Sequence, residues 1–236
     1  MNKKLKRGLV VSCQATPEEP MFGSDIMAKM AIAAQQGGAV AVRVNTYPDL
    51  VAVRQAVDIP ILGLIKSTYE GYYPYITPTM KEVDLVVKSG AEIVCIDATK
   101  YPRPDGRTLE QFITDIREKH PTAEILADVS TVEEGLYAQQ LGVDYVATTL
   151  VGYTPDTIDQ TAEVIQEFRE PNFEIIEQLV KVVDIPVLAE GRFWDSINAI
   201  KALQKGAHAV AIGAGITRPQ IITKKIVDAI NESDLL

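Results

Sequence analysis

Eight short apolar runs alternate with amphipathic segments along this chain, and the alternation predicts a parallel α/β fold. Five of the intervening segments, 25–38, 77–90, 108–120, 131–142 and 193–206, have the 3.6-residue period of helices. Eight repeats of strand and helix favour a closed (β/α)8 barrel, the TIM barrel, over an open doubly wound sheet. No linker or shift in composition interrupts the pattern, so we predict a single domain over residues 1–236. The apolar runs are 8–14, 39–45, 59–66, 92–98, 124–130, 144–152, 185–191 and 208–215.

Local signals mark where several of these helices should begin and end. Thr77-Pro78 and Ser130-Thr131 are predicted to open helices, because threonine, serine and proline are favoured at helix starts. Glycines that follow the periodic segments are predicted to close them, at Gly37, Gly90, Gly142 and Gly206.

Polar residues gather where the apolar runs end. In a parallel barrel all these carboxyl ends lie on one rim, which is where barrel enzymes carry their active sites. The alternative is that such residues only cap the following helices. That reading suits Ser130 and Thr131, but it suits Lys66 and Arg43 poorly, because a cation near a helix N-terminus opposes the helix dipole. We therefore favour an active site built from the rim residues Gln14, Arg43, Asn45, Lys66, Asp97, Asp128, Thr148, Thr149, Glu190, Gly213 and Gly215.

Three connections on this rim are longer than usual: 67–76, 99–107 and 152–172. Within the third, residues 161–168 are predicted to form an extra helix. The first contains four tyrosines, which either wall a bound sugar or pack the loop against the barrel: Tyr69, Tyr72, Tyr73 and Tyr75.

The last two runs predict an anion site. Glu190-Gly191-Arg192 follows the seventh run and GAGITRP follows the eighth. Glycines let backbone N–H groups approach phosphate oxygens, and loops at these two positions of a barrel often hold a phosphate. We assign to substrate binding Thr149, Gly191, Arg192, Gly213 and Arg218.

Lys66, Glu190 and Asp128 are the candidates for chemistry. The two histidines, His120 and His208, stand apart from them, so no metal-binding set is apparent, and no nucleotide-binding or serine-hydrolase motif occurs. A lysine and carboxylates beside an anion site suit proton transfer next to a carbonyl, or Schiff-base formation on the lysine. Both require Lys66 to lose its proton near neutral pH. Burial and a nearby cation would lower its pKa, whereas a carboxylate or phosphate would raise it.

Composition and charge limit the classes of partner that this protein is expected to bind. The net charge of −9 argues against nucleic acid or an anionic membrane as a main partner. No stretch approaches the roughly 18 apolar residues of a spanning helix, and the apolar run after the basic start is too short for a signal peptide. Cys13 and Cys95 lie within apolar runs, which indicates reduced core cysteines of a cytoplasmic protein rather than a disulfide or a catalytic thiol.

Nine stretches, spread over nearly the whole chain, carry a resemblance to a known family: LKRGLVVSCQA, GGAVAVRVN, ILGLIK, YITPTMKEVD, IDATKYPRPDG, LADVSTVEEG, ATTLVGYT, VLAEGR and GAGITRP. In these stretches the chain resembles the N-acetylmannosamine-6-phosphate 2-epimerase family. The resemblance implies a TIM barrel that interconverts N-acetylmannosamine 6-phosphate and N-acetylglucosamine 6-phosphate in amino-sugar or sialic acid breakdown, with no metal or redox cofactor.

The resemblance also implies roles for particular residues. Lys66 and Glu190 match the acid–base positions of the family. The sugar-contacting positions correspond to Gln14, Arg43 and Asp128, and the phosphate contact to Arg218. Lys66 and Glu190 would then face C2 of the sugar from opposite sides of the barrel mouth.

Two other functions remain open at this point. The first is a class I lyase that uses Lys66 as an imine-forming nucleophile, and the second is a non-catalytic sugar-phosphate-binding protein. The expected partner is in each case a phosphorylated sugar. We also expect a homodimer, since barrels of this kind often pair through their helices.

Overall fold

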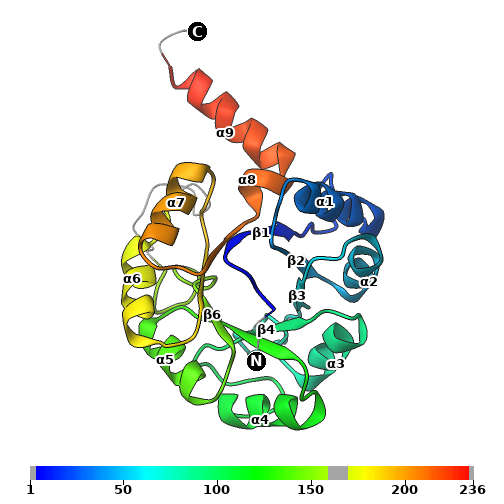
Figure 1. The fold of residues 1–236 in the computed structure, drawn as a ribbon, viewed down its shortest axis with the longest axis vertical. Helices are drawn as coiled ribbons and strands as arrows, with labels where there is room; N and C mark the ends of the chain where they lie inside the picture. Colours follow the sequence, from blue (N-terminus) through cyan, green and yellow to red (C-terminus); the bar gives the residue numbers. More distant parts are fainter. Residues whose placement is uncertain (1–3, 159–169, 234–236) are drawn as a thin grey trace.

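The computed structural model describes residues 4–158 and 170–233, and within them eight parallel strands close into a barrel (Figure 1). Each strand pairs with its neighbours in chain order, and pairing of the first strand with the eighth closes the ring. The predicted (β/α)8 barrel is confirmed. The strands are β1 Gly8–Cys13, β2 Ala41–Asn45, β3 Ile61–Leu64, β4 Ile93–Asp97, β5 Glu124–Asp128, β6 Tyr145–Ala147, β7 Val187–Glu190 and β8 Ala209–Ile212.

Helices follow the strands, and all of them except the last lie around the barrel (Figure 1). They are α1 Ser24–Gln36, α2 Tyr47–Ala56, α3 Met80–Lys88, α4 Leu109–Lys119, α5 Val132–Gln140, α6 Phe173–Val182, α7 Ser196–Gln204, α8 Ala214–Thr217 and α9 Pro219–Asn231. The extra helix predicted at 161–168 falls outside the described residues.

The strands are apolar on both faces because both faces are buried. One set of side chains fills the interior of the barrel, and the alternate set packs under the helices. Leu62 and Cys95 belong to the interior cluster, while Val11 and Cys13 belong to the layer beneath the helices. Both cysteines are buried and free, as the apolar runs around them predicted.

Helix starts agree with the sequence in one case and differ in another. Thr131 caps α5, as predicted, and it also forms a reciprocal capping box with Glu134. In contrast, α3 begins later than predicted, because Thr79 rather than Thr77 caps it. Thr77 has a positive φ of 46°, and its buried hydroxyl accepts a hydrogen bond from the Ile65 N–H at 3.1 Å. It therefore fastens the loop after β3 instead of opening a helix.

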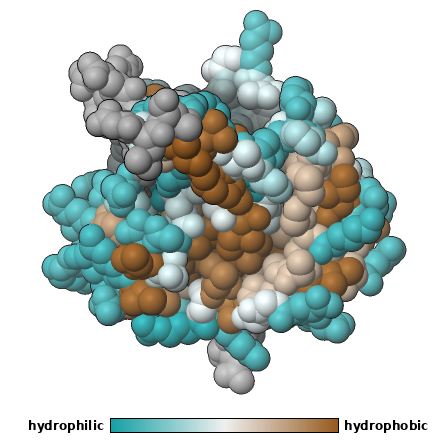
Figure 2. All heavy atoms as spheres, turned by 90° about the horizontal axis from the view of Figure 1, so that it is seen from above, coloured by the Kyte–Doolittle hydropathy of each residue, from teal (hydrophilic) through white to brown (hydrophobic). Residues whose placement is uncertain are grey.

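Helix α9 departs from the barrel pattern. It leaves the outer layer and projects away from the rest of the molecule (Figure 1). None of its side chains is buried, and Ile226 and Ile230 remain 56% and 48% exposed. Figure 2 shows apolar residues gathered on the side from which this helix emerges. Within the described residues, no helix combines the length and apolarity needed to cross a membrane.

Candidate active site

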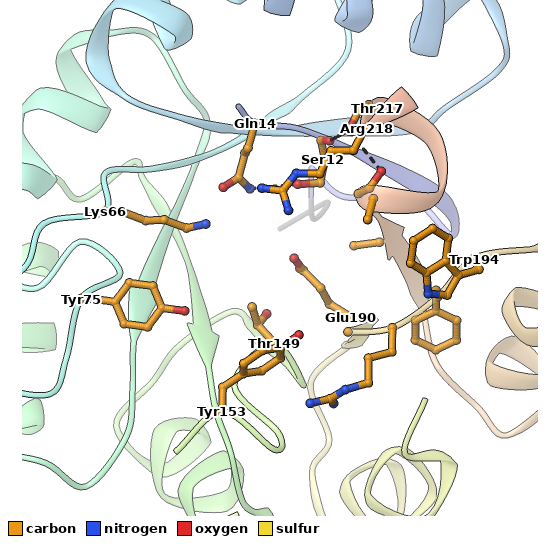
Figure 3. A pocket seen from close by; sticks show the side chains of 16 residues that line it. Ser12, Gln14, Lys66, Tyr75, Thr149, Tyr153, Glu190, Trp194, Thr217 and Arg218 are labelled. Carbon is orange, nitrogen blue, oxygen red and sulfur yellow. Dashed lines mark hydrogen bonds between the residues drawn. The ribbon is translucent and has the colours of Figure 1, made fainter. Parts of the chain in front are cut away.

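A pocket of about 280 Å³ opens at the carboxyl ends of the strands (Figure 3). Both predicted acid–base residues, Lys66 and Glu190, line it. Six of the predicted substrate-binding residues line it as well: Gln14, Thr149, Gly191, Arg192, Gly213 and Arg218. The predicted residues from several strand ends thus line one cavity, because parallel pairing brings the carboxyl ends of distant strands to the same side of the barrel.

Lys66 stands two residues beyond the end of β3, where the chain folds back on itself. An isolated antiparallel bridge joins Lys66 to Ile76, and the Ser67 N–H donates to the Tyr75 carbonyl at 2.9 Å. On the other side, the Lys66 N–H donates to Asn45 Oδ1 at 2.9 Å. These contacts fix the main chain of Lys66, and its ammonium points into the pocket (Figure 3).

Glu190 is the last residue of β7 and directs its carboxylate into the same pocket (Figure 3). The Arg43 guanidinium lies beneath it and donates to this carboxylate through Nη1. Through Nη2, Arg43 donates to Asp128 at 2.7 Å. Thr149 completes the network, because its hydroxyl accepts from Arg43 at 3.1 Å and donates to Asp128.

The sequence predicted sugar contacts for Arg43 and Asp128, but neither residue lines the pocket. They are 1% and 0% exposed, and each is paired with the other. Arg43 lies on the inward face of β2, on the same side as Ala41, so it points into the barrel below the mouth. In this arrangement both act on the pocket through Glu190 and Thr149, and direct sugar contact by either stays a prediction.

Burial and charge move the pKa values of the two facing residues in opposite directions. The Lys66 side chain is exposed at the mouth of the pocket, but protein surrounds its ammonium group. This desolvation is the largest cause that lowers the pKa of Lys66 to about 8, and the charge of Arg43 is the next. Burial, followed by the Asp128 carboxylate, raises the pKa of Glu190, while Arg43 opposes the rise. The two values therefore approach each other.

A lysine with a pKa near 8 is able to exchange protons at neutral pH. Roughly a tenth of the Lys66 side chains are then neutral at pH 7, against roughly 0.03% for the ordinary value of 10.5. Because the Lys66 and Glu190 pKa values approach each other, passing one proton between them costs less free energy than it would between groups with their ordinary pKa values. Such a pair suits an acid and a base that exchange roles.

The corner predicted to hold an anion is formed by α8 and the turn after β7. Gly213 precedes α8, and the Thr217 hydroxyl fastens this short helix to β1 by donating to the Ser12 carbonyl at 2.7 Å. A Cβ on Gly215 would lie 2.9 Å from the Trp194 Cα, so only glycine fits there without displacement. The corner is therefore a close approach of two backbone segments with a cation, Arg218, beside it.

The two arginines of this corner have protein partners of their own. Arg218 pairs through Nε with Glu19 at 3.1 Å. Arg192 donates to the Val151 carbonyl at 2.9 Å and stacks over the Tyr153 ring at 4.6 Å. Arg192 thus fastens the loop after β6, and its predicted contact with a phosphate stays a prediction.

Gln14 offers a hydrogen-bonding atom to a ligand. Its Nε2 donates to the Ser12 hydroxyl at 2.9 Å, whereas its buried Oε1 has no hydrogen-bond partner among the described residues. A buried acceptor without a donor costs free energy. A hydroxyl or amide N–H of a bound sugar would satisfy it.

The tyrosines of the loop after β3 divide between the two roles left open. Tyr75 lines the pocket. Tyr69 instead donates to Glu82 at 2.9 Å, and Tyr73 donates to the Tyr153 carbonyl, so these two pack the loop against its neighbours. Tyr72 is 41% exposed.

Sequence reasoning missed several residues that line the pocket: Ser12, Tyr153, Phe193, Trp194 and Thr217. Only their closeness to predicted residues along the chain could have indicated them. Among the residues that the structure describes, no group of three or more His, Cys, Asp or Glu side chains is arranged to hold a metal ion.

Comparison with known proteins agrees with this geometry. Residues 27–232 match the model of the family described as "Putative N-acetylmannosamine-6-phosphate epimerase". A relative named "Putative N-acetylmannosamine-6-phosphate 2-epimerase", from Caldanaerobacter subterraneus subsp. tengcongensis, is 52% identical over 98% of this chain and 94% of its own. One with the same name, from Shouchella clausii, is 43% identical over 97% of each chain.

Solved structures agree as well. The N-acetylmannosamine-6-phosphate 2-epimerase from Clostridium perfringens superposes with a TM-score of 0.87 at 43% identity, covering 96% of this chain and 94% of that one. A thiamine phosphate pyrophosphorylase from Pyrococcus furiosus, at 21% identity and a TM-score of 0.58, shares the barrel fold. The chain belongs to the N-acetylmannosamine-6-phosphate epimerase family.

Proposed function

We propose that this chain interconverts N-acetylmannosamine 6-phosphate and N-acetylglucosamine 6-phosphate by exchanging the proton at C2, in amino-sugar or sialic acid catabolism. The observation that carries the proposal is the placement of Lys66 and Glu190 in one pocket, Lys66 just beyond β3 and Glu190 at the end of β7, two strands that lie opposite each other in the ring of eight. We place the phosphate at the neighbouring corner, formed by Gly191, Gly213 and Arg218, and call it the phosphate corner.

The chemistry follows from the substrate. Opening the sugar ring leaves an aldehyde at C1, which makes the C2 proton acidic. One member of the pair removes this proton from one face, and the C–H electrons form the C1–C2 double bond of an enolate, whose negative charge lies on the C1 oxygen. The other member then delivers its proton to C2 from the opposite face, which inverts the centre. Anchoring the phosphate holds C2 between them.

Proton balance explains why a lysine and a carboxylic acid suit this task. The pair shares one mobile proton, carried by Lys66 in one state and by Glu190 in the other. The forward reaction converts one state into the other, and the reverse reaction restores it. The low Lys66 pKa and the raised Glu190 pKa keep both states accessible.

Proton NMR in heavy water tests the proposal directly. We expect the purified protein to replace the C2 proton of N-acetylmannosamine 6-phosphate by deuterium while N-acetylglucosamine 6-phosphate appears. Lys66→Met and Glu190→Gln should each abolish the exchange. Lys100→Met is the matched control, since Lys100 is a lysine on the same rim that does not line the pocket. No exchange by the wild type would refute the function, and near-normal exchange by Lys66→Met would refute its role.

The same sample distinguishes the lyase. Borohydride added with substrate should leave the mass of the protein unchanged, because the proposed reaction forms no imine. A stable adduct on Lys66 would instead support Schiff-base chemistry.

We also propose that the chain forms a homodimer through α9. In a complete barrel the eighth helix covers the side between α7 and α1, but here it projects outward (Figure 1). The apolar residues of α9 and those of α7, including Ile197 at 76% and Ile200 at 54% exposure, are left open to water. Packing α9 of each copy against the second copy would bury both surfaces.

The dimer predicts a specific hydrodynamic result. Light scattering after size-exclusion chromatography should give twice the chain mass, and Ile226→Asp combined with Ile230→Asp should give the single-chain mass. Tyr137→Asp, which changes an exposed apolar residue on α5, serves as control and should stay dimeric. A monomeric wild type would refute the proposal.

The cysteines and the net charge bear on the location of the protein and on its partners. We propose a cytoplasmic protein, which the free, buried Cys13 and Cys95 support. The net charge of −9 supports the expectation that nucleic acid is not a partner.

A further inference from the structure

The main chains of the two acid–base residues are held by side chains from the preceding strand. Asn45, the last residue of β2, accepts the Lys66 N–H at 2.9 Å through Oδ1. Thr148, just after β6, uses one hydroxyl for two bonds to Glu190. It accepts from the Glu190 N–H at 2.9 Å and donates to the Glu190 carbonyl at 2.8 Å.

These side-chain bonds occur where backbone pairing with the preceding strand has ended. The last pair between β2 and β3 joins Asn45 to Leu64, two residues before Lys66. The last pair between β6 and β7 joins Ala147 to Leu188, again two residues before Glu190.

Backbone contacts hold the opposite side of each acid–base residue. Glu190 pairs with Ala211 of β8, and Lys66 bridges to Ile76. Without Asn45 and Thr148, the main chain of each reactive residue would be held on one side only.

We propose that Asn45 and Thr148 are positioning residues for the C2 proton transfer, an inference that rests on the proposed epimerase function. Neither lines the pocket, and Thr148 is 3% exposed, so both act through Lys66 and Glu190. Transfer to both faces of one carbon requires the acid and the base to be in place together. A displacement of about 1 Å at either of them costs about 100-fold in rate.

Replacing Thr148 tests the inference. Thr148→Val keeps the shape of the side chain and removes both bonds, whereas Thr148→Ser keeps the hydroxyl. We expect Thr148→Val to lower kcat for C2 exchange by about 10- to 100-fold, with KM within about twofold because the phosphate corner is untouched. Thr148→Ser should recover most of the lost kcat. A kcat for Thr148→Val within twofold of the wild type, or an equal loss in Thr148→Ser, would overturn the inference.

Two further variants complete the design. Ser89→Ala removes a buried hydroxyl away from the pocket, one at the end of α3 that donates to the Val86 carbonyl at 2.6 Å, and it should leave kcat unchanged. Asn45→Leu removes the acceptor for Lys66 and should lower kcat in the manner of Thr148→Val. It keeps the inference testable if Thr148→Val fails to fold, because an unchanged kcat in a folded Asn45→Leu protein also overturns it.

Amide hydrogen exchange gives a readout that does not depend on turnover. The Glu190 N–H should exchange slowly in the wild type and faster in Thr148→Val, while the Thr148→Ser protein keeps its protection. If the wild type failed to exchange the C2 proton of the substrate, the proposed function would be refuted. Equal exchange rates of the Glu190 amide in the wild type and in Thr148→Val would instead show that Thr148 does not hold Glu190.

Discussion

Raising the pH should switch off both directions of the epimerisation near pH 8. The active pair shares one proton, and above the Lys66 pKa of about 8 that proton leaves the free enzyme. The forward and reverse reactions draw on the same one-proton state, so they share this alkaline limit.

The expected magnitude follows from the titration curve. At pH 9 roughly a tenth of the enzyme keeps the shared proton, so kcat/KM should fall to about a tenth of its plateau. With an ordinary lysine pKa of 10.5, roughly 97% would be retained. A single comparison of pH 7.5 with pH 9 therefore distinguishes the two cases.

Initial rates of C2 exchange by NMR, at substrate concentrations well below KM, measure kcat/KM at each pH. The acid side is less informative, because the second ionisation of a phosphate monoester, near pH 6, changes the charge of the substrate there. Arg218→Met provides a second test. The charge of Arg218 contributes to the low pKa of Lys66, so its removal should move the alkaline limit above pH 8.

The predicted fall in kcat/KM at alkaline pH does not come from unfolding caused by the titration of Lys66. The folded-state pKa lies below the unfolded value, so between about pH 8 and 10.5 the unfolded chain binds more protons at this residue. The contribution of Lys66 to stability therefore rises with pH over this window, and circular dichroism at pH 7.5 and 9 checks that the fold is intact. A kcat/KM at pH 9 above half its plateau value, in a folded protein, would refute the shared-proton argument.

Three further predictions concern the frame around the pocket. Asp128→Leu leaves the buried Arg43 without one of its carboxylates, and should lower the free energy of unfolding in urea by about 3–5 kcal/mol; a loss below about 1 kcal/mol would contradict it. Gly63→Ala places a Cβ 2.8 Å from a side chain of α3, and should cost about 1–3 kcal/mol in the same urea assay, with kcat/KM per folded molecule unchanged. Gly215→Ala forces α8 away from the Trp194 backbone and should raise KM for the sugar phosphate by about tenfold, with kcat much less affected; an unchanged KM would show that this close approach does not shape the phosphate corner.

The barrel could be predicted because its physics is local and repetitive. Parallel strands covered on both faces must be apolar throughout, so each strand appears as an uninterrupted run such as residues 92–98. Parallel strands also bring their carboxyl ends to one rim. For that reason Lys66 and Glu190, 124 positions apart, could be assigned to the same pocket from the sequence.

Two kinds of feature could not be predicted from the sequence. One is a contact between particular side chains, and the other is the depth of a residue below the mouth of the barrel. Arg43 precedes the end of its strand by two residues, and this offset places it below the mouth, paired with Asp128. Asn45 and Thr148 resemble ordinary strand-end residues until their bonds to neighbouring backbones are seen. Likewise, nothing in the local pattern distinguishes Thr77 from Thr79 as the cap of α3.

Helix α9 starts at the residue after Arg218, so the outlying helix and the cation of the phosphate corner are consecutive parts of the chain. Lys225, on this helix, also lies 4.3 Å above the ring of Trp194, which lines the pocket. If Arg218 anchors the substrate phosphate, as we propose, a compound bound at the start of α9 would weaken that anchoring without entering the pocket. Such a compound need not carry the charge that a mimic of a sugar phosphate requires.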